Sequence, residues 1–380
     1  MRTVRQKVFN DFVCAADKCP DTCCKGWEIV IDDDTLEYYK NYSGDIRSTL
    51  DNCIDYDKSI IKYDDEGKCL LLREDGLCSL VREAGEESLC DTCHLYPRHV
   101  EEYEDVREWS IAVSCPIAAH LVLTDENHEY ITESDNEIDP LEEDFDDFDL
   151  LLFDKLEVSR EFLYRVIRNK ELPIHERLSI CLKMAYLMQK CIDDEEIYKI
   201  DELCNSWEKD GIENLCVKWN DDEENLWIEE YLKRNVQLLS ELEHLRPEWE
   251  RFLEIIDSNF DELTKTYVFI NGIESKSEFI RDDYLQNLME SCIYTYYLGA
   301  VYDDMLYAKV GLSVFVTMMA EYLYVVSMHK RIQSEKTDVI SCFDELEANL
   351  ERIVYSLARE IEHSDDNLNT VESYFDKECV

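Results

Sequence analysis

Cys14–Trp27 reads CAADKCPDTCCKGW and places four cysteines, Cys14, Cys19, Cys23 and Cys24, within one short stretch. Adjacent cysteines such as the last two rarely serve core packing, because a pair of neighbouring side chains seldom faces the same interior. The stretch therefore predicts a small, irregular region built around thiols. Its folding depends on what those thiols bind.

A second cysteine cluster lies further along the chain, in Leu89–Arg98 (LCDTCHLYPR). The two-residue gap in Cys90-x-x-Cys93 lets both thiolates point at one ion, while amides of the turn donate to the sulfurs. Cys69 and Cys78 come before this cluster and Cys115 follows it. Ten of the seventeen cysteines thus fall between Cys14 and Cys115, and this concentration predicts a shared site.

The stretch around Cys69 and Cys78 has the pattern of a β-hairpin. Residues Cys69–Leu72 and Leu77–Val81 flank Glu74-Asp75-Gly76, and Asp-Gly is a strong turn signal. In this hairpin Cys78 would lie opposite Arg73 or Leu71. Both thiols would then face one side of the ribbon, which suits two ligands of one site better than a cross-strand disulfide.

The cysteines leave several interpretations open. Disulfides match the density but require an oxidising compartment. Structural zinc suits thiolates as well as an iron–sulfur cluster does, and spacing does not separate the two. Cys90-Asp91-Thr92-Cys93-His94 also matches the pattern of covalent haem attachment, which requires export, so we interpret His94 as a surface or structural residue. Buried free thiols best explain the seven scattered cysteines, at positions 181, 191, 204, 216, 292, 342 and 379.

Composition argues against two classes of partner. A formal net charge of −49 repels phosphate backbones, so we expect no nucleic-acid partner. Met1–Asp11 lacks the apolar run of an export signal, so a cytoplasmic protein is expected. The most apolar segment, Gly311–Met328, is shorter than the roughly 20 residues of a spanning helix and contains Glu321. We interpret it as a buried core helix and expect no membrane partner.

The chain divides into two compositional halves. We predict a Cys-rich metal-binding region at residues 1–125, an acidic connection at 126–149 and a helical domain at 150–380. Apolar residues recur at helical spacing beyond the connection, as in Phe162 and Val166. Further helices are expected at Ile174–Ile192, Glu224–Leu245, Pro247–Phe260, Tyr284–Leu298, Met305–Ile332 and Phe343–His363, with Ser341 as a possible cap of the last one. The fold class is therefore mainly α: a small irregular Cys-rich N-terminal region with a short β-hairpin, followed by a helical domain.

Other cofactor and catalytic patterns are missing from the sequence. None of the nine glycines forms the Gly-x-Gly-x-x-Gly turn of a Rossmann-type cofactor site. The Cys-x3-Cys-x2-Cys pattern of radical enzymes fails because Gly26 stands at its third position. Tyrosines and acids between Tyr294 and Asp304 could face a cation, but a packed helix with a polar end explains them better.

Taken together and in order, four pieces of the first 120 residues resemble the flagellin lysine N-methylase family. They are Cys19–Trp27 (CPDTCCKGW), Gly76–Cys78 (GLC), Gly85–Arg98 (GEESLCDTCHLYPR) and Arg107–Ala119 (REWSIAVSCPIAA). Leu163–Leu178 and Tyr294–Tyr307 are similar to the family's helical part more loosely.

The resemblance implies a cytoplasmic enzyme that moves a methyl group from S-adenosylmethionine to lysines of flagellin and holds a cysteine-bound iron–sulfur cluster, most simply 4Fe-4S, with zinc as the alternative metal. The matched cysteines are Cys14, Cys19, Cys23, Cys24, Cys69, Cys78, Cys90, Cys93 and Cys115. Nine exceeds the four thiolates of one cubane, so either some are structural or there are two centres. The first ligands expected are Cys19, Cys23, Cys24, Cys90 and Cys93. A non-enzymatic metal-binding module or adaptor is the alternative function.

Overall fold

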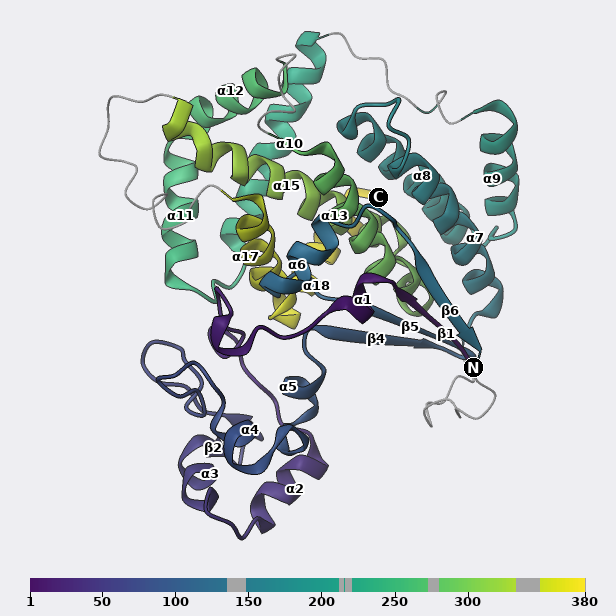
Figure 1. Ribbon diagram of the computed structural model, residues 1–380. Helices are drawn as coiled ribbons and strands as arrows, with labels where there is room; N and C mark the ends of the chain where they lie inside the picture. The colour runs from purple at the N-terminus through teal and green to yellow at the C-terminus, as the bar shows by residue number, and fades with distance from the viewer. Residues whose placement is uncertain (135–147, 212–214, 216–220, 273–279, 333–348, 380) are drawn as a thin grey trace.

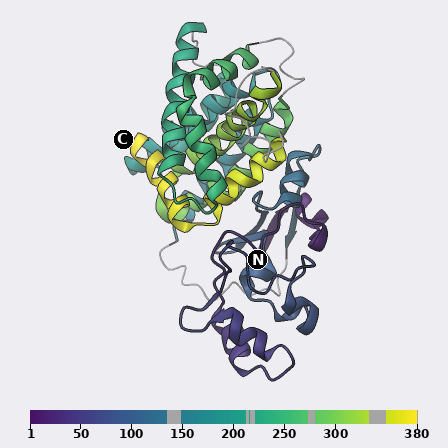
Figure 2. The same ribbon diagram turned by 90° about the vertical axis from the view of Figure 1, so that its left-hand side faces the viewer.

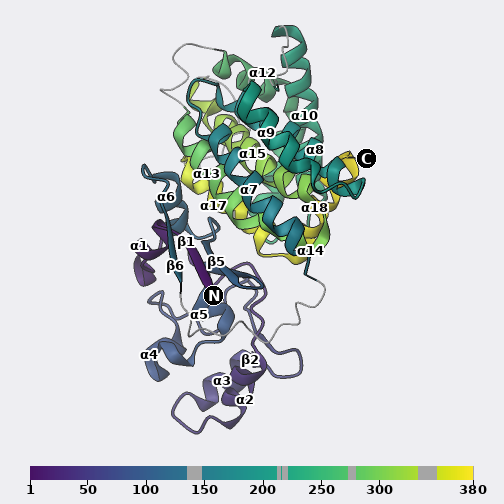
Figure 3. The ribbon, with the colours of Figure 1, turned by 90° about the vertical axis from the view of Figure 1, so that its right-hand side faces the viewer.

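The computed structural model describes residues 1–134, 148–211, 215, 221–272, 280–332 and 349–379. Within these residues the chain is mainly α-helical, with a small strand-containing region near the N-terminus, which confirms the predicted fold class. The helical part occupies one end of the molecule and residues from about 30 to 90 occupy the other (Figures 1, 2 and 3). A small sheet lies between them.

The N-terminal third is built from short elements. Its helices are α1 (Val8–Asp11), α2 (Asp33–Asn41), α3 (Arg47–Cys53), α4 (Ser79–Ala84), α5 (Asp91–Leu95) and α6 (Pro116–Leu123). Its strands are β1 (Arg2–Gln6), β2 (Ile54–Asp55), β3 (Ile60–Ile61), β4 (Arg98–Tyr103), β5 (Val106–Ile111) and β6 (Tyr130–Ser134). Strands β2 and β3 form a separate antiparallel pair.

A four-stranded sheet in the order β4-β5-β1-β6 was not expected from the sequence. Strand β1 pairs in parallel with β5 and antiparallel with β6, while β4 and β5 form an antiparallel hairpin. Strand β6 falls inside the segment assigned to the acidic connection, and residues 135–147 of that segment lie outside the described residues. Pairing between β1 and β5 joins residues about a hundred positions apart, and such long-range pairing leaves little local signal in a sequence.

The predicted hairpin at residues 69–81 is wrong in register and extent. An isolated antiparallel bridge joins Leu72 to Cys78, one position away from both predicted partners, and Cys69 bridges Tyr63 instead. The second predicted strand is replaced from Ser79 onward by helix α4. Cys78 follows the turn and stands at the N-cap of α4. Because the helix begins at the next residue, the second strand ends after a single bridge.

The helical part consists of long helices around a common core. They are α7 (Leu150–Ile167), α8 (Ile174–Asp193), α9 (Lys199–Asp210), α10 (Asp221–Glu241), α11 (Pro247–Ser258), α12 (Phe260–Asn271), α13 (Asp282–Tyr296), α14 (Ala300–Asp303), α15 (Leu306–Ile332), α17 (Leu350–Glu362) and α18 (Asp365–Cys379). As predicted, Pro173 immediately precedes α8 and Pro247 begins α11. Helices α9, α12 and α18 were not predicted. Ser341 lies outside the described residues, and Asn349 caps α17 instead.

Helix α15 runs through the middle of the helical part (Figure 1). Its segment Leu306–Met328 is long and apolar enough to cross a membrane by length and composition, and is longer than the sequence estimate. However, 94% of its most apolar window is buried inside the molecule. Glu321 within it accepts from the Tyr267 hydroxyl at 2.8 Å and contacts His175 at 2.6 Å. The segment is therefore the core helix that the sequence predicts.

Two hydrophobic cores organise the molecule. The larger includes the long helices and also Val8, Phe12 and side chains of β5 and α6. The smaller is built from residues 29–90, where Cys69 and Cys90 are buried members and Cys24, Cys78 and Cys93 pack against it. The first 125 residues thus contribute to both cores. Which segments fold as independent units stays a prediction.

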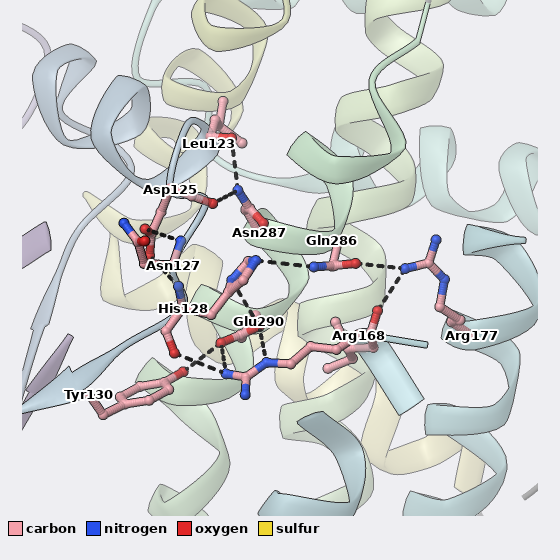
Figure 4. Close-up of polar contacts among 11 residues, drawn as sticks. Leu123, Asp125, Asn127, His128, Tyr130, Arg168, Arg177, Gln286, Asn287 and Glu290 are labelled. Carbon is pink, nitrogen blue, oxygen red and sulfur yellow. Dashed lines mark hydrogen bonds and ion pairs between the residues drawn. The ribbon is translucent and has the colours of Figure 1, made fainter. Parts of the chain in front are cut away.

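A polar network ties the segment after α6 to the long helices (Figure 4). Glu290 of α13 accepts from Arg168 at 2.9 Å and from the Tyr130 hydroxyl at 3.0 Å. Asn287 donates to the backbone carbonyls of Leu123 and Asp125 at 2.9 and 2.8 Å. The adjoining cavity measures about 10 Å³, room for about one water molecule. We interpret this network as structural.

Candidate functional site

The nine predicted metal ligands fall into two groups whose members act on one another electrostatically. The first thiol group is Cys14, Cys19, Cys23 and Cys115. Burial raises the pKa of Cys19 and of Cys115, with further contributions from Cys14 and Cys19 respectively. The pKa of Cys23 is raised by its hydrogen bond to Cys24 and by burial, with Cys14 and Cys115 adding to the effect. Cysteines from both ends of the N-terminal third therefore lie near one another.

The second thiol group is Cys24, Cys69, Cys78, Cys90 and Cys93. Burial raises the pKa of Cys69 to about 12, and the charges of Cys24 and Cys78 add to it. Burial likewise raises the pKa of Cys78, with contributions from Cys24 and Cys90. Cys93 is hydrogen-bonded to Cys90, which raises the pKa of Cys93 and lowers that of Cys90. Because Cys24 is also hydrogen-bonded to Cys23, these adjacent cysteines link the second group to the first.

Backbone contacts assemble the second thiol group. The Cys69 amide donates to the Cys24 carbonyl at 2.9 Å, which places the two cysteines side by side. Asp32 caps α2 by accepting from the Thr35 amide at 2.8 Å, and its second oxygen accepts from the Asp91 amide at 3.0 Å. The same carboxylate therefore fixes the turn that starts α5, in which Cys90 and Cys93 lie.

Cys78, Cys90 and Cys115 occupy the same position relative to a helix. Each is the residue at the N-cap, of α4, α5 and α6 respectively. Burial raises the pKa of Cys78 and Cys115, but backbone amides two and three residues further on oppose this rise. The Cys69 sulfur receives the same contacts from Leu71 and Leu72. Amides directed at sulfur favour a thiolate, the form that binds metal.

The sulfurs do not yet form a coordination sphere. All described cysteines are free, so the disulfide interpretation finds no support in this part of the chain. In the described ranges no group of three or more His, Cys, Asp or Glu side chains is arranged closely enough to hold a metal ion. The set of ligands, and the first choice of Cys19, Cys23, Cys24, Cys90 and Cys93, stays a prediction.

Arg359 of α17 joins the two stretches that supply the first thiol group. Its side chain is 1% exposed, and it donates from Nη2 to the Asp21 carbonyl at 2.9 Å and from Nε to the Ser114 carbonyl at 2.7 Å. Its charge lowers the pKa of both Cys19 and Cys115 against the effect of burial. A fixed cation among several thiols compensates the negative charge of thiolates.

Asp21 is held between two arginines. Its Oδ2 lies 2.8 Å from Nη1 of Arg359 and 3.0 Å from Nη1 of Arg246. Burial raises the pKa of Asp21, but Arg359 and Arg246 outweigh it and the net pKa is lowered. The carboxylate is therefore charged, and it neutralises part of the positive charge beside the first thiol group.

Aromatic side chains border the first thiol group on another side. The Trp27 indole donates to the Cys23 carbonyl at 2.7 Å and stacks on the His363 ring at 4.3 Å between centroids. Tyr96 contacts both rings, at 5.4 Å and 5.5 Å. These three side chains line a cavity of about 280 Å³ together with Tyr296 and Glu362. The cavity thus shares a wall with the loop that contains Cys23.

A second and larger cleft has Asp21 in its lining. It measures about 520 Å³, and its lining includes Asp21, Lys25, Arg246, Trp249 and Glu360. Both cavities are lined by residues of the cysteine-rich loop and of the α17 end of the chain. Helix α17 packs against α6 (Figure 1).

Sequence reasoning found the cysteines but missed their partners. Arg246, Arg359, Glu362 and His363 lie more than a hundred residues beyond Cys115 and form no motif with it. Tyr296 belongs to the tyrosine-rich stretch that we interpreted as a packed helix end. His94 is exposed, as expected. Of the scattered cysteines, Cys181, Cys191, Cys204 and Cys292 are buried and Cys379 is half-buried, whereas Cys216 and Cys342 lie outside the described residues.

Comparison with known proteins gives a consistent result. A 132-residue stretch is 31% identical to flagellar biosynthetic protein FliU of Salmonella muenchen, covering 32% of this chain and 78% of that protein. Matches of the same length, 30% and 29% identical, occur in the lysine-N-methylases of Salmonella typhimurium and Salmonella choleraesuis. The chain matches only about a third of the length of these two enzymes. No solved structure shows a significant match.

The second half of the chain gives the broadest match. Residues 160–380, more than half of the chain, match the model of the FliB lysine N-methylase C-terminal domain. This protein therefore belongs to the FliB lysine N-methylase family.

Proposed function

We propose that this protein is a protein-lysine N-methyltransferase that transfers a methyl group from S-adenosylmethionine to lysine side chains of flagellin. The observation that carries the proposal is the family match over residues 160–380. The partial similarity to two lysine-N-methylases and to a flagellar biosynthetic protein supports both the reaction class and a flagellar substrate.

Methyl transfer from a sulfonium to an amine requires a particular geometry and environment at the site. The lysine nitrogen, after losing its proton, forms a bond to the methyl carbon; the bond between that carbon and the sulfonium breaks, and sulfur keeps the electron pair as a neutral thioether. The methylated nitrogen then carries the positive charge and releases it with a proton. This displacement needs in-line positioning and exclusion of water. The cavity of about 280 Å³ beside the first thiol group supports this proposal with its aromatic walls of Trp27, Tyr96 and Tyr296.

We further propose that the thiol groups hold metal, as an iron–sulfur cluster or as zinc. The donor set suits either metal, because thiols are supplied in number and backbone amides directed at Cys69, Cys78 and Cys115 oppose part of the rise in pKa that burial causes. The first thiol group contains four cysteines and the second five, so each has enough for four-thiolate ligation. Side-chain rearrangement would have to bring the sulfurs to bonding distance. An iron–sulfur cluster would supply electron transfer, and zinc would supply a fixed thiolate scaffold.

The test is transfer of a labelled methyl group. The full chain, purified without oxygen, is incubated with flagellin and methyl-labelled S-adenosylmethionine, with dithionite added or omitted, and the flagellin is hydrolysed. We expect label in methyl-lysine and none when the flagellin lysines have been acetylated beforehand. Absence of label in lysine under both conditions would defeat the proposal and leave a metal-binding module without methyl transfer.

A further inference from the structure

A buried carboxylate faces the smaller cavity with one oxygen unsatisfied. Oε1 of Glu362 accepts from the Tyr296 hydroxyl at 3.0 Å, whereas Oε2 is buried without a hydrogen-bond partner. An unpaired buried carboxylate oxygen costs free energy unless a ligand completes it. Glu362 therefore has an unfilled place for a hydrogen-bond donor.

A second unsatisfied acceptor lines the same cavity. Nε2 of His363 is buried and has no hydrogen-bond partner. Burial, together with the charges of Arg359 and Arg246, lowers the pKa of His363 to about 3. The ring is therefore neutral at physiological pH and can accept a hydrogen bond.

The walls of the cavity suit a cation. Trp27, Tyr96 and Tyr296 present aromatic rings to it, and rings of this kind attract ammonium groups. The charged lining consists of Glu362, Asp365, Arg98 and, when protonated, His99. Arg98 is directed at other rings, with its guanidinium carbon 5.1 Å from the Phe12 ring centre, and His99 contacts Glu101 at 2.7 Å. The nearby Arg359 is paired with Asp21. Burial raises the pKa of Glu362, against hydrogen bonds from Ser114 and Tyr296 and the charge of His99, so a cation beside its carboxyl would favour the charged form.

The volume of the cavity limits the kind of ligand that it can hold. Sites for whole small molecules occupy roughly 300–1,000 Å³, so about 280 Å³ suits one long side chain better than a nucleoside with an amino-acid tail. We propose that this cavity binds the side chain of a substrate lysine, with its nitrogen held by Glu362 and His363 and its methylene chain between the aromatic rings. This inference rests on the proposed function and adds the site at which the protein substrate is held.

Binding can be measured apart from methyl transfer. The full chain is titrated by ligand-observed NMR with N-α-acetyl-lysine methylamide, and with the norleucine analogue, which has the same chain length without the amine. We expect saturable binding of the lysine compound alone. Equal binding of both compounds, or of neither, would overturn the proposal.

Two variants locate the binding. Glu362→Gln should weaken binding of the lysine compound by at least about tenfold, because a hydrogen bond to a charged partner is lost. The matched control is Glu378→Gln, since Glu378 also accepts from a tyrosine hydroxyl, that of Tyr374 at 3.1 Å, but lies outside both cavities. Unchanged affinity in Glu362→Gln would contradict the proposal even if wild-type protein binds lysine.

The outcome separates this inference from the proposed function. Lysine binding that depends on Glu362, without any methyl transfer to flagellin, keeps the cavity assignment and defeats the methyltransferase. Methyl transfer with the same KM for flagellin in wild type and Glu362→Gln keeps the methyltransferase and defeats the cavity assignment.

Discussion

At the scale of single residues, the buried charges of α17 matter most to the site. Arg359, Glu360, Glu362 and His363 follow one another closely at the end of this helix, and each is buried or half-buried. Arg359 is paired with Asp21, whereas Glu360 and Glu362 each have an oxygen without a partner. Burying so many polar groups at one helix end lowers the stability of the fold, because each loses its contacts with water. Such groups commonly cluster where ligands bind.

Glu360 should make stability depend on pH. Burial raises its pKa from the ordinary 4.5 to about 7, while Oε2 accepts from the Leu245 amide at 2.9 Å. A carboxyl with a raised folded-state pKa keeps its proton longer in the folded than in the unfolded protein. The contribution of Glu360 to the free energy of unfolding is therefore most favourable at low pH, and it is lost as pH rises from about 4.5 to about 7.

We predict that Glu360→Gln removes this loss. Relative to wild type, the free energy of unfolding of the variant should improve by up to about 3 kcal/mol between pH 5 and pH 8. Urea unfolding of both proteins at both pH values measures the difference in their free energies of unfolding. The effects of the other carboxylates are the same in both proteins and cancel in this difference. A difference between the two proteins that is the same at both pH values would contradict the raised pKa.

The cysteines themselves could be predicted from the sequence at this scale, because their spacing and adjacency are local. The division into two groups could not. It depends on Arg359 bridging Asp21 and Ser114, and no local pattern links Arg359 to a loop more than three hundred residues earlier.

At the scale of elements, a buried ion pair helps to join the sheet to the helices. Arg160 of α7 donates to both carboxylate oxygens of Glu108 on β5, at 2.7 and 2.6 Å, and the side chains are 8% and 4% exposed. The helices at 174, 247 and 305 were predictable because proline and apolar spacing mark them. The pairing of β1 with β5, which presents Glu108 to α7, was not predictable, since the two strands lie far apart in the sequence.

We predict that Arg160→Met destabilises the protein by about 3–5 kcal/mol, because the Glu108 carboxylate is left buried without its partner. The control is Arg165→Met on the same helix. Arg165 lies 3.5 Å from Glu208, with both side chains at least 60% exposed, so this change should cost less than about 1 kcal/mol. Chemical unfolding of the three proteins gives the comparison. Equal losses in the two variants would show that the buried pair does not stabilise the joint.

At the scale of the whole molecule, a thiol-rich unit with its own small core is attached to a larger helical core. Cys115 belongs to the larger core and Cys69 and Cys90 to the smaller one, and both cavities lie beside the same loop. The mainly α class followed from composition and spacing, whereas the division into a separate thiol-rich region stays a prediction. The contact of α17 with the stretches that contain the first thiol group could not be predicted, because it depends on packing between distant parts of the chain.

We propose that thiols from distant stretches of this chain come together to bind metal in two groups. Elemental analysis and X-ray absorption on protein purified without oxygen test it directly, for wild type and for Cys115→Ser, Cys90→Ser and the control Cys181→Ser, which changes a buried thiol of α8. We predict iron or zinc bound to sulfur in wild type and in the control, and a partial loss in each of the other two variants, from a different group in each. Wild-type protein with neither metal, or with metal bound only to oxygen and nitrogen, would contradict the claim.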